Sequence, residues 1–494
     1  MYLKNKSMNT LPKHVHIIGI CGVATSALAI ALHDKGVKVT GSDKGIYPPV
    51  STHLDESGIT YHTGWHPELI GTPDEIVMGG GGTSTSNPEV MYAKEHNIPL
   101  LSFAEALGKY IIKEKSIVVT GTWGKTTISS ILSFILIQAG LDPSYFTGGL
   151  SLSHKTGAIS DSPWSVVEGD EYQVSISDRR PKFVFYKPTH LLLTSVSWDH
   201  ADLYPTEKEY FDTFESLIKN IPENGALVIC ADDEGVNKVI STPSALEKND
   251  RGSKKTVTYG KTQKSDYYYH SIEHSKEGLK FIISHNGADY MIASPMLGKF
   301  NAENITAAFA MAHTIGISPD NIVKAIHSFK GIKRRLEKRF EGDVTVLDCH
   351  APTPEKAMSV LESVRDVYKD KIIAVYEPNI GGRQRASAAM YDNAFKDADV
   401  VVIPRLSKLK VASNSADMSE SEKPLESEEL TQIISETHKN VVYFEDDTVL
   451  VQFLKQQTKK GDTIAFLGSH GFRGMIEETI DKISNNQYPI TNDK

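Results

Sequence analysis

Short runs of β-branched and apolar residues alternate with helical patterns along nearly the whole chain. The first run is 14–20, HVHIIGI, which is followed by a glycine and a helical pattern over 24–35. A new apolar strand begins the pattern afresh at 116–120 and again at 344–348. Alternating strands and helices are typical of α/β units built on parallel sheets. The three beginnings therefore predict an α/β protein of three domains.

The same pattern predicts where these domains begin and end. We expect a Rossmann-like domain over 1–113, a central α/β domain over 114–331 and a second Rossmann-like domain over 332–494. Two polar stretches without hydrophobic periodicity, 241–255 and 408–429, are expected to be surface insertions or partly disordered segments.

Composition narrows the class of protein. A formal net charge of −9 gives no electrostatic reason to expect nucleic acid or an anionic membrane as a partner. The cysteines number three and lie far apart, which argues against a disulfide framework and fits a reducing compartment. No stretch reaches the roughly 18 apolar residues that a membrane helix needs. We expect a cytoplasmic protein.

The strongest chemical signal is a glycine turn between an apolar strand and an amphipathic helix, GTWGKTT at 121–127. Glycines let successive backbone N–H groups point at phosphate oxygens, and the helix N-terminus adds positive potential. In such a turn Lys125 would reach the β- and γ-phosphates, and the hydroxyl of Thr126 would ligate Mg²⁺. The turn predicts ATP binding by Gly121, Thr122, Gly124, Lys125, Thr126 and Thr127.

GTxGKTT after a strand resembles the Mur ligase family, which builds the bacterial cell wall by ATP-dependent amide formation. Four further segments follow in the order of that family: EGDEY at 168–172, DHAD at 199–202, GKFNAEN at 298–304 and GIKRRLE at 331–337. Trp123 and Phe300 each stand where the resemblance leads us to expect histidine.

The resemblance implies a role for one residue or more in each segment. Glu168 would be a metal ligand, and His200 would lie near a second Mg²⁺ or an acyl phosphate. Arg335 would bring a guanidinium to the γ-phosphate on domain closure, where it would stabilise developing charge. The expected catalytic residues are Lys125, Glu168, His200 and Arg335, and the expected metal ligands are Thr126, Glu168 and His200.

Three more residues are expected at the nucleotide. Asn301 and Asn304 would approach the adenine. Asp348 would serve the ribose, although the segment around it, LDCHAPT at 347–353, departs from the family's pattern and leaves the role of His350 open.

The N-terminal turn GICG, 19–22, is by itself as consistent with a plain tight turn as with a binding site. Followed by GSDKGIYPPVS at 41–51, it resembles the uridine-diphosphate-binding domain of ligases that act on UDP-N-acetylmuramic acid. In such domains the turn and the helix N-terminus hold the pyrophosphate. The residues expected there are Gly19, Gly22, Ser42, Asp43 and Asn87.

Within the family, the segments 41–51 and 170–188 are more like the member that attaches the tripeptide L-alanyl-γ-D-glutamyl-meso-diaminopimelate to UDP-N-acetylmuramate than the member that attaches L-alanine. The implied reaction passes through an acyl phosphate, with the amine substrate bound by the C-terminal domain. The divergent segments 347–353 and 377–385 leave L-alanine open as the substrate. A P-loop ATPase and a non-catalytic UDP-sugar-binding protein are the alternatives of other classes.

Overall fold

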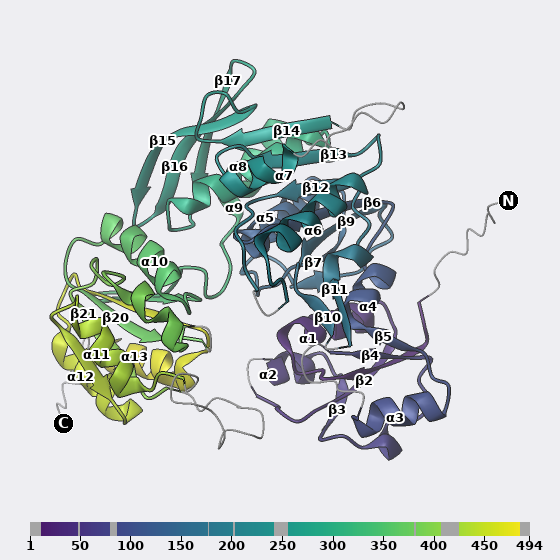
Figure 1. Cartoon of the computed structure of the whole chain (residues 1–494), viewed down its shortest axis with the longest axis horizontal. Coiled ribbons are helices and arrows are strands. Elements are labelled where there is room, and N and C mark those ends of the chain that lie inside the picture. Colours follow the sequence, from purple (N-terminus) through teal and green to yellow (C-terminus); the bar gives the residue numbers. More distant parts are fainter. Residues whose placement is uncertain are drawn as a thin grey trace, which may run out of the picture. The chain divides into compact units, whose positions relative to one another are not determined.

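The computed structural model describes residues 11–47, 50–79, 86–175, 177–200, 203–241, 255–379, 382–406 and 424–484 (Figure 1). Most of the predicted polar insertions, as well as Pro48, Pro49, Ala201 and Asp202, lie outside these residues. The chain divides into two compact units. The first comprises 1–271, 281–294 and 302–330, and the second comprises 272–280, 295–301 and 331–494.

The first unit begins with a five-stranded parallel sheet of order β3-β2-β1-β4-β5. Its strands are β1 (His14–Ile18), β2 (Lys38–Asp43), β3 (Thr60–Thr63), β4 (Glu75–Met78) and β5 (Leu100–Ser102). The helices are α1 (Val23–Asp34), α2 (Val50–Glu56), η1 (Pro67–Leu69), α3 (Pro88–Glu95) and α4 (Phe103–Tyr110). The strand order reverses between β1 and β4, and ligands of open α/β sheets bind outside the carboxyl ends of the strands at such a point.

A ten-stranded sheet of order β17-β16-β15-β14-β13-β12-β6-β9-β7-β8 follows. Its strands are β6 (Lys115–Thr120), β7 (Ser144–Phe146), β8 (Gly157–Ala158), β9 (Trp164–Gly169), β12 (His190–Leu193), β13 (Ala226–Cys230), β14 (Lys255–Gly260), β15 (Tyr267–Ser275), β16 (Gly278–His285) and β17 (Ala288–Ser294). Strand β6 pairs in parallel with β9 and β12, so the segments that follow these three strands meet at one edge.

Helices cover this sheet, and a short hairpin lies beside it (Figure 1). The helices are α5 (Lys125–Gln138), α6 (Glu207–Lys219), α7 (Glu234–Ile240), α8 (Phe300–Thr314) and α9 (Pro319–Ser328). The hairpin is formed by β10 (Gln173–Ser175) and β11 (Asp178–Pro181), and is followed by η2 (Lys182–Phe185). Helix α5 is buried along most of its length, which matches its apolar sequence.

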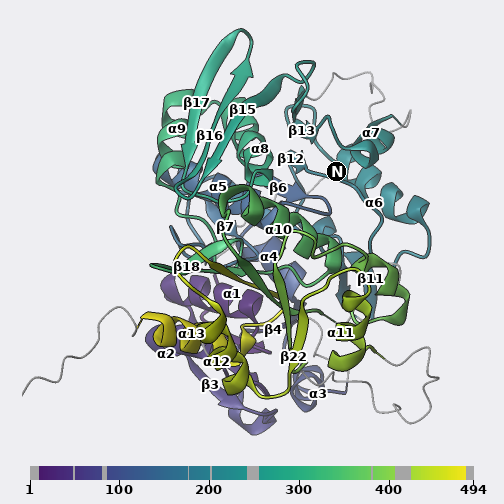
Figure 2. The ribbon, with the colours of Figure 1, turned by 90° about the vertical axis from the view of Figure 1, so that its left-hand side faces the viewer.

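The second unit contains a six-stranded sheet of order β18-β19-β23-β20-β21-β22. Its strands are β18 (Glu337–Glu341), β19 (Thr345–Cys349), β20 (Ile372–Glu377), β21 (Val400–Pro404), β22 (Val441–Phe444) and β23 (Thr463–Gly468). The helices are α10 (Pro354–Val367), η3 (Arg385–Tyr391), α11 (Ser427–Ser435), α12 (Asp447–Gln457), η5 (Phe472–Gly474) and α13 (Met475–Ser484). Apolar residues of α10 and α11 pack on one face, and those of α12 and α13 pack on the other (Figure 2).

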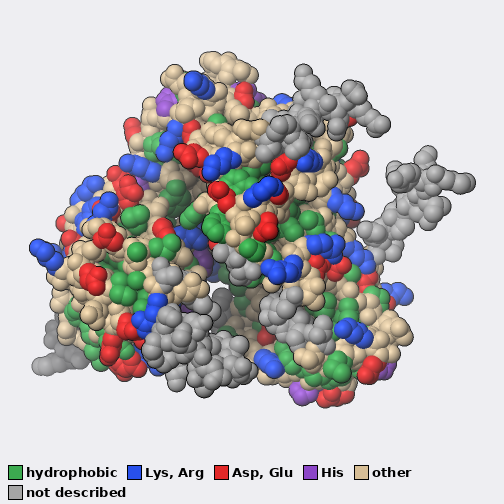
Figure 3. Space-filling view, in the orientation of Figure 1, with side chains coloured by type: hydrophobic (Ala, Val, Ile, Leu, Met, Phe, Trp, Pro, Cys, Tyr) green, Lys and Arg blue, Asp and Glu red, His purple; other side chains and the backbone are tan. Residues whose placement is uncertain are grey.

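Charged side chains are mixed rather than segregated on the face that Figure 3 shows, where Lys and Arg lie among Asp and Glu. Among the described residues, no helix is long and apolar enough to cross a membrane.

The segment after β12 is fixed by its contact with α7. Asp233, the N-cap of α7, accepts hydrogen bonds from the backbone N–H of Val236 at 2.8 Å and of Val196 at 3.0 Å. A Cβ atom at Gly235 would lie 1.7 Å from the carbonyl oxygen of Val196. Position 235 therefore has no room for a side chain.

We expect Gly235→Ala to lower the free energy of unfolding by about 3 kcal/mol, because the new methyl group must push the segment after β12 away from α7. Thermal denaturation of the purified variant measures this. Gly471→Ala is the matched control, since a Cβ atom there meets nothing within 4 Å. Equal melting temperatures for the two variants would contradict the prediction.

Candidate active site

The loop between β6 and α5 turns tightly against the end of β12. Gly121 has a φ of +130° and Gly124 one of +82°, in the region that favours glycine. A Cβ atom at Gly121 would lie 2.3 Å from Oγ1 of Thr194. Gly124 is the N-cap of α5 and has no side chain to bond the first N–H groups of that helix. The loop thus has the backbone geometry of an anion site.

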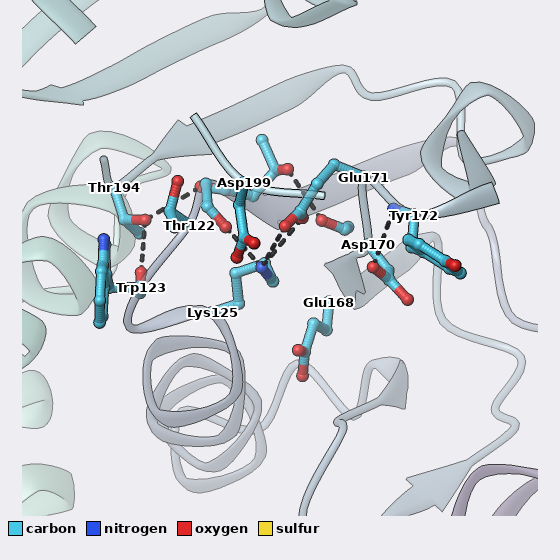
Figure 4. Close-up of polar contacts among 12 residues, drawn as sticks. Thr122, Trp123, Lys125, Glu168, Asp170, Glu171, Tyr172, Thr194 and Asp199 are labelled. Carbon is cyan, nitrogen blue, oxygen red and sulfur yellow. Dashed lines mark hydrogen bonds and ion pairs between the residues drawn. The ribbon is translucent and has the colours of Figure 1, made fainter. Parts of the chain in front are cut away.

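The ammonium of Lys125 lies in a ring of oxygen atoms (Figure 4). Its Nζ donates to Oε1 and Oε2 of Glu171, at 3.1 and 2.9 Å, and to the carbonyl oxygen of Gly121 at 2.5 Å. Burial alone would lower the pKa of Lys125, but the charges of Glu171 and Glu168 outweigh it and raise that pKa. Lys125 is therefore held as a cation at the start of α5.

Glu171 also lies close to His200. Its side chain is only 2% exposed, and its Oε1 lies 3.7 Å from Nε2 of His200. The interaction with Glu171 raises the pKa of His200, against the opposing effect of burial. Tyr204 also donates its hydroxyl hydrogen to the backbone oxygen of Glu171, at 2.6 Å. Sequence reasoning placed Glu171 at this strand end within EGDEY but gave it no role.

The residue after Lys125, Thr126, brings its hydroxyl oxygen to the carboxylate of Glu168. The hydroxyl of Thr126 donates to Oε1 of Glu168 at 3.1 Å, and Gly148 donates its backbone N–H to Oε2 of Glu168 at 2.9 Å. A hydroxyl and a carboxylate suit Mg²⁺, which takes few protein ligands and completes its shell with phosphate oxygens and water. The donor set therefore fits this ion. Within the described residues, no group of three or more His, Cys, Asp and Glu side chains is arranged around a metal position.

The predicted asparagines of α8 have different surroundings. Asn301 is 1% exposed and donates from Nδ2 to the carbonyl oxygen of Leu297 at 2.7 Å. Asn304 lies against the phosphate loop, since a Cβ atom at Gly124 would be 2.6 Å from its Oδ1. Only Asn304 is thus seen beside the loop, and the contact of both residues with adenine stays a prediction.

Arg334 and Arg335, neighbours in the second unit, differ in their hydrogen-bond and ion-pair partners. Arg334 donates to the carbonyl oxygens of Gly468, Ser469 and His470, at 2.9, 3.1 and 2.7 Å, and pairs with Asp348 at 3.3 Å. The guanidinium of Arg335 forms no hydrogen bond or ion pair with the described residues of this unit. Arg335 is half-buried.

Asp348 and His350 lie beside these arginines. Asp348 is 1% exposed, and its burial raises its pKa although Arg334 and Arg339 act in the opposite direction. Burial and the positive charges of Arg335 and Arg334 lower the pKa of His350 to about 4, so its imidazole is neutral at neutral pH.

The predicted UDP-sugar residues meet at the carboxyl ends of β1 and β2. Gly19 donates its N–H to the carbonyl oxygen of Ser42 at 2.7 Å. Asp43 accepts the N–H of Cys21 at 2.9 Å, which fixes the turn that ends at Gly22. These contacts bring together four of the five residues that the sequence assigned to this site.

Asn87 is connected to this site by Glu89, which hydrogen-bonds both Asn87 and Ser42. Its Oδ1 caps α3 by accepting the N–H of Glu89 at 2.8 Å. Glu89 is fully buried, and its carboxylate accepts from the hydroxyl of Ser42 at 2.5 Å and from His62 at 3.2 Å. Burial would raise the pKa of Glu89, but the nearby imidazole of His16, 3.8 Å away, and the hydrogen bond from Ser42 lower it to about 2. Sequence reasoning gave Glu89 no role of its own.

Comparison with known proteins extends the similarity over nearly the whole chain. Three family models match: the Mur ligase family catalytic domain over 14–115, the Mur ligase middle domain over 119–312 and the Mur ligase glutamate ligase domain over 334–470. The UDP-N-acetylmuramate–L-alanyl-γ-D-glutamyl-meso-2,6-diaminoheptandioate ligase of Haemophilus influenzae is 30% identical over 372 residues, which cover 74% of this chain and 80% of the relative. The UDP-N-acetylmuramate–L-alanine ligase of an Arthrobacter species is 32% identical over 401 residues, 81% of this chain and 82% of the relative.

Solved structures have the same fold. A UDP-N-acetylmuramate–alanine ligase from Thermotoga maritima superposes with a TM-score of 0.76 at 21% identity, covering 96% of this chain and 99% of the other. A murein peptide ligase from Psychrobacter arcticus gives a TM-score of 0.67 at 24% identity, with the same coverage. The predicted three-domain α/β fold is confirmed.

A glycine turn on a parallel sheet, with Rossmann-like domains before and after it in the chain, is the architecture that this chain shares with these ATP-dependent ligases. The chain belongs to the Mur ligase family. Members of this family are ATP-dependent, ADP-forming amide ligases of peptidoglycan synthesis, and the chain is an enzyme of this class.

We expect Glu171→Gln to lower the pKa of His200, because the carboxylate that stabilises the imidazolium becomes a neutral amide. Because folding raises the pKa of His200, the protonated imidazole stabilises the folded protein at low pH. This contribution to the free energy of unfolding disappears as the pH rises through the folded-state pKa of His200. NMR titration of isotope-labelled histidine measures the shift, with His200→Gln to assign the signal. An unchanged pKa would show that Glu171 does not act on His200.

The two arginines provide a second prediction. We expect Arg334→Ala to destabilise the protein by about 3 kcal/mol, because it removes a partner of the buried Asp348 carboxylate. Arg335→Ala is the matched control and is expected to leave the melting temperature unchanged. Thermal denaturation that ranked the two variants in the opposite order would contradict this reading.

Proposed function

We propose that this enzyme joins UDP-N-acetylmuramate to the tripeptide L-alanyl-γ-D-glutamyl-meso-diaminopimelate, with conversion of ATP to ADP and phosphate. The observation that carries the chemistry is the convergence of Lys125, Thr126 and Glu168 at the N-terminus of α5. The similarity of 41–51 and 170–188 to the tripeptide-adding member supports the choice of amine, as does the Haemophilus influenzae relative.

In the proposed first step, a carboxylate oxygen of the lactyl group attacks the γ-phosphorus of ATP and the bond to the ADP oxygen breaks. The entering phosphates take the place of the Glu171 carboxylate, so that the Lys125 ammonium donates to phosphate oxygens. Thr126 and Glu168 would hold Mg²⁺, which neutralises charge on the transferring phosphoryl group when it is bound. The N–H groups at the start of α5 supply further donors.

In the second step, the amine of the tripeptide attacks the carbonyl carbon of the acyl phosphate, the amide bond forms and inorganic phosphate leaves. The amine loses a proton in this step. His200, whose Nε2 lies 3.7 Å from Oε1 of Glu171, is suited to take up that proton once the nucleotide is in place. We retain the predicted contacts of Arg335 with the γ-phosphate and of Asp348 with the ribose as parts of this proposal. Binding of a second metal ion by His200 is the alternative to its role as proton acceptor.

We assign the substrates to the domains that the sequence predicts. UDP-N-acetylmuramate is proposed to bind 1–113, through Gly19, Gly22, Ser42, Asp43 and Asn87. ATP is proposed to bind 114–331, and 332–494 is proposed to bind the amine substrate.

L-Alanine is the second candidate for the amine. The Arthrobacter relative is an L-alanine ligase at 32% identity, which favours this reading. Both candidates use the same carboxylate and the same phosphoryl transfer, so they differ only in what the C-terminal domain accepts.

One incubation separates the candidates. The purified enzyme is given ATP, Mg²⁺ and UDP-N-acetylmuramate, in parallel with L-alanine or the tripeptide, and the products are read by mass. We expect the amide of the tripeptide. The amide of L-alanine alone would contradict our choice of substrate, and phosphate release without any amide would instead indicate an ATPase.

We expect Lys125→Ala to slow amide formation by at least about 100-fold, because a charged donor to the transferring phosphoryl group is lost. Lys238→Ala is the matched control, since Lys238 is 61% exposed and its ammonium contacts Glu207 and the ring of Phe211 rather than the phosphate loop. A Lys125→Ala enzyme with wild-type turnover in the same assay would rule out the proposed phosphoryl transfer.

A further inference from the structure

We infer that the indole of Trp123 is the surface on which the base of the bound nucleotide stacks. This inference rests on the proposed binding of ATP to the loop 121–127. Trp123 stands in the middle of that loop, and the chemistry of phosphate binding gives its large side chain no task.

The backbone of Trp123 is fixed on both sides. Its N–H donates to the hydroxyl of Ser195 at 3.0 Å, and its carbonyl oxygen accepts from the hydroxyl of Thr194 at 2.6 Å. Both partners follow β12, so the position of the Trp123 backbone is fixed relative to the sheet. A Trp side chain has only two rotatable bonds, which makes it a contact surface with a low entropy cost on binding.

The side chain of Trp123 is partly exposed. Trp123 is 46% exposed, whereas the other residues of 121–127 are buried or half-buried. A partly exposed indole beside a phosphate site offers aromatic surface that a base can cover, because every base has a π-face that stacks on aromatic side chains.

The direction of the side chain fits this use. Figure 4 shows the indole of Trp123 at the far end of the loop from the ammonium of Lys125. The next residue, Gly124, lies against α8, since a Cβ atom added to it would be only 2.6 Å from Oδ1 of Asn304. A nucleotide whose phosphates lie at Lys125 would thus extend its base toward Trp123 and Asn304, where an amide can bond the base edge while the indole covers its face.

Trp198 supplies the matched control. Its exposed fraction, 48%, is close to that of Trp123. It lies in the segment after β12, the strand whose following residues bond the backbone of Trp123. Its indole N–H, however, donates to the carbonyl oxygen of Tyr204 at 3.0 Å, which directs the ring toward the segment after DHAD.

Calorimetry with Mg²⁺-ATP and with inorganic tripolyphosphate tests the inference without the sugar or the amine. We expect Trp123→Ala to weaken ATP binding by about tenfold and Trp123→Phe, which keeps a ring, by no more than about threefold. Tripolyphosphate has no base, so its affinity should be the same in the wild type and in Trp123→Ala. Trp198→Ala should bind both compounds as the wild type does.

Three results would overturn the inference: an equal loss of tripolyphosphate and ATP affinity in Trp123→Ala, an unchanged ATP affinity in that variant, or no ATP binding by the wild type. The first would show that Trp123 shapes the phosphate loop instead of contacting the base. A wild type that binds ATP through Trp123 but forms no amide would refute the proposed function and leave this inference standing.

Discussion

A buried carboxylate needs a cationic partner, and the partner of the Glu171 carboxylate is Lys125 of the phosphate loop. An ionised group that is 2% exposed would be very unfavourable alone, so Glu171 holds Lys125 at hydrogen-bond distance and His200 close by. The ammonium is thereby placed over the start of α5 before any nucleotide arrives. Glu171 comes from the end of β9 and Lys125 from the loop after β6, two strands that pair in parallel. The register between β6 and β9 thus determines how Lys125 and Glu171 are placed relative to each other.

Buried carboxylates stand at comparable places in the other two sheets. Glu89 is fully buried near the ends of β1 and β2, where it accepts hydrogen bonds from Ser42 and His62. Asp348 is 1% exposed near the end of β19, where Arg334 also bonds the carbonyl oxygens after β23. The carboxyl ends of parallel strands are where ligands of α/β sheets bind. Each sheet thus has a buried carboxylate near the carboxyl ends of its strands. The hydrogen bonds and ion pairs of that carboxylate hold the neighbouring segments in place, and we propose that these segments form a substrate site.

The sequence predicted what depends on local pattern and missed what depends on packing. The strands at 14–20, 116–120 and 344–348 were predictable because apolar runs next to glycine turns are a local signal. Asn87 was assigned from the sequence to the UDP-sugar site, and its cap on α3 was not predicted. The pairing of Glu171 with Lys125 was not predicted either, because neighbours across a sheet are set by register. The resemblance singled out Arg335, but it did not predict that Arg334 donates to the carbonyl oxygens at the end of β23, because that contact also depends on packing.

Substrate identity and chemistry are separate questions, and the central claim concerns the chemistry: a carboxylate is activated by phosphoryl transfer at Lys125. The most direct test is to label both oxygens of the lactyl carboxylate of UDP-N-acetylmuramate with oxygen-18 and to measure the mass of the released phosphate after amide formation. An acyl phosphate leaves with the bridging carboxylate oxygen, so we expect each phosphate to carry a single heavy oxygen. Phosphate without the label, released while the amide forms, would contradict the claim.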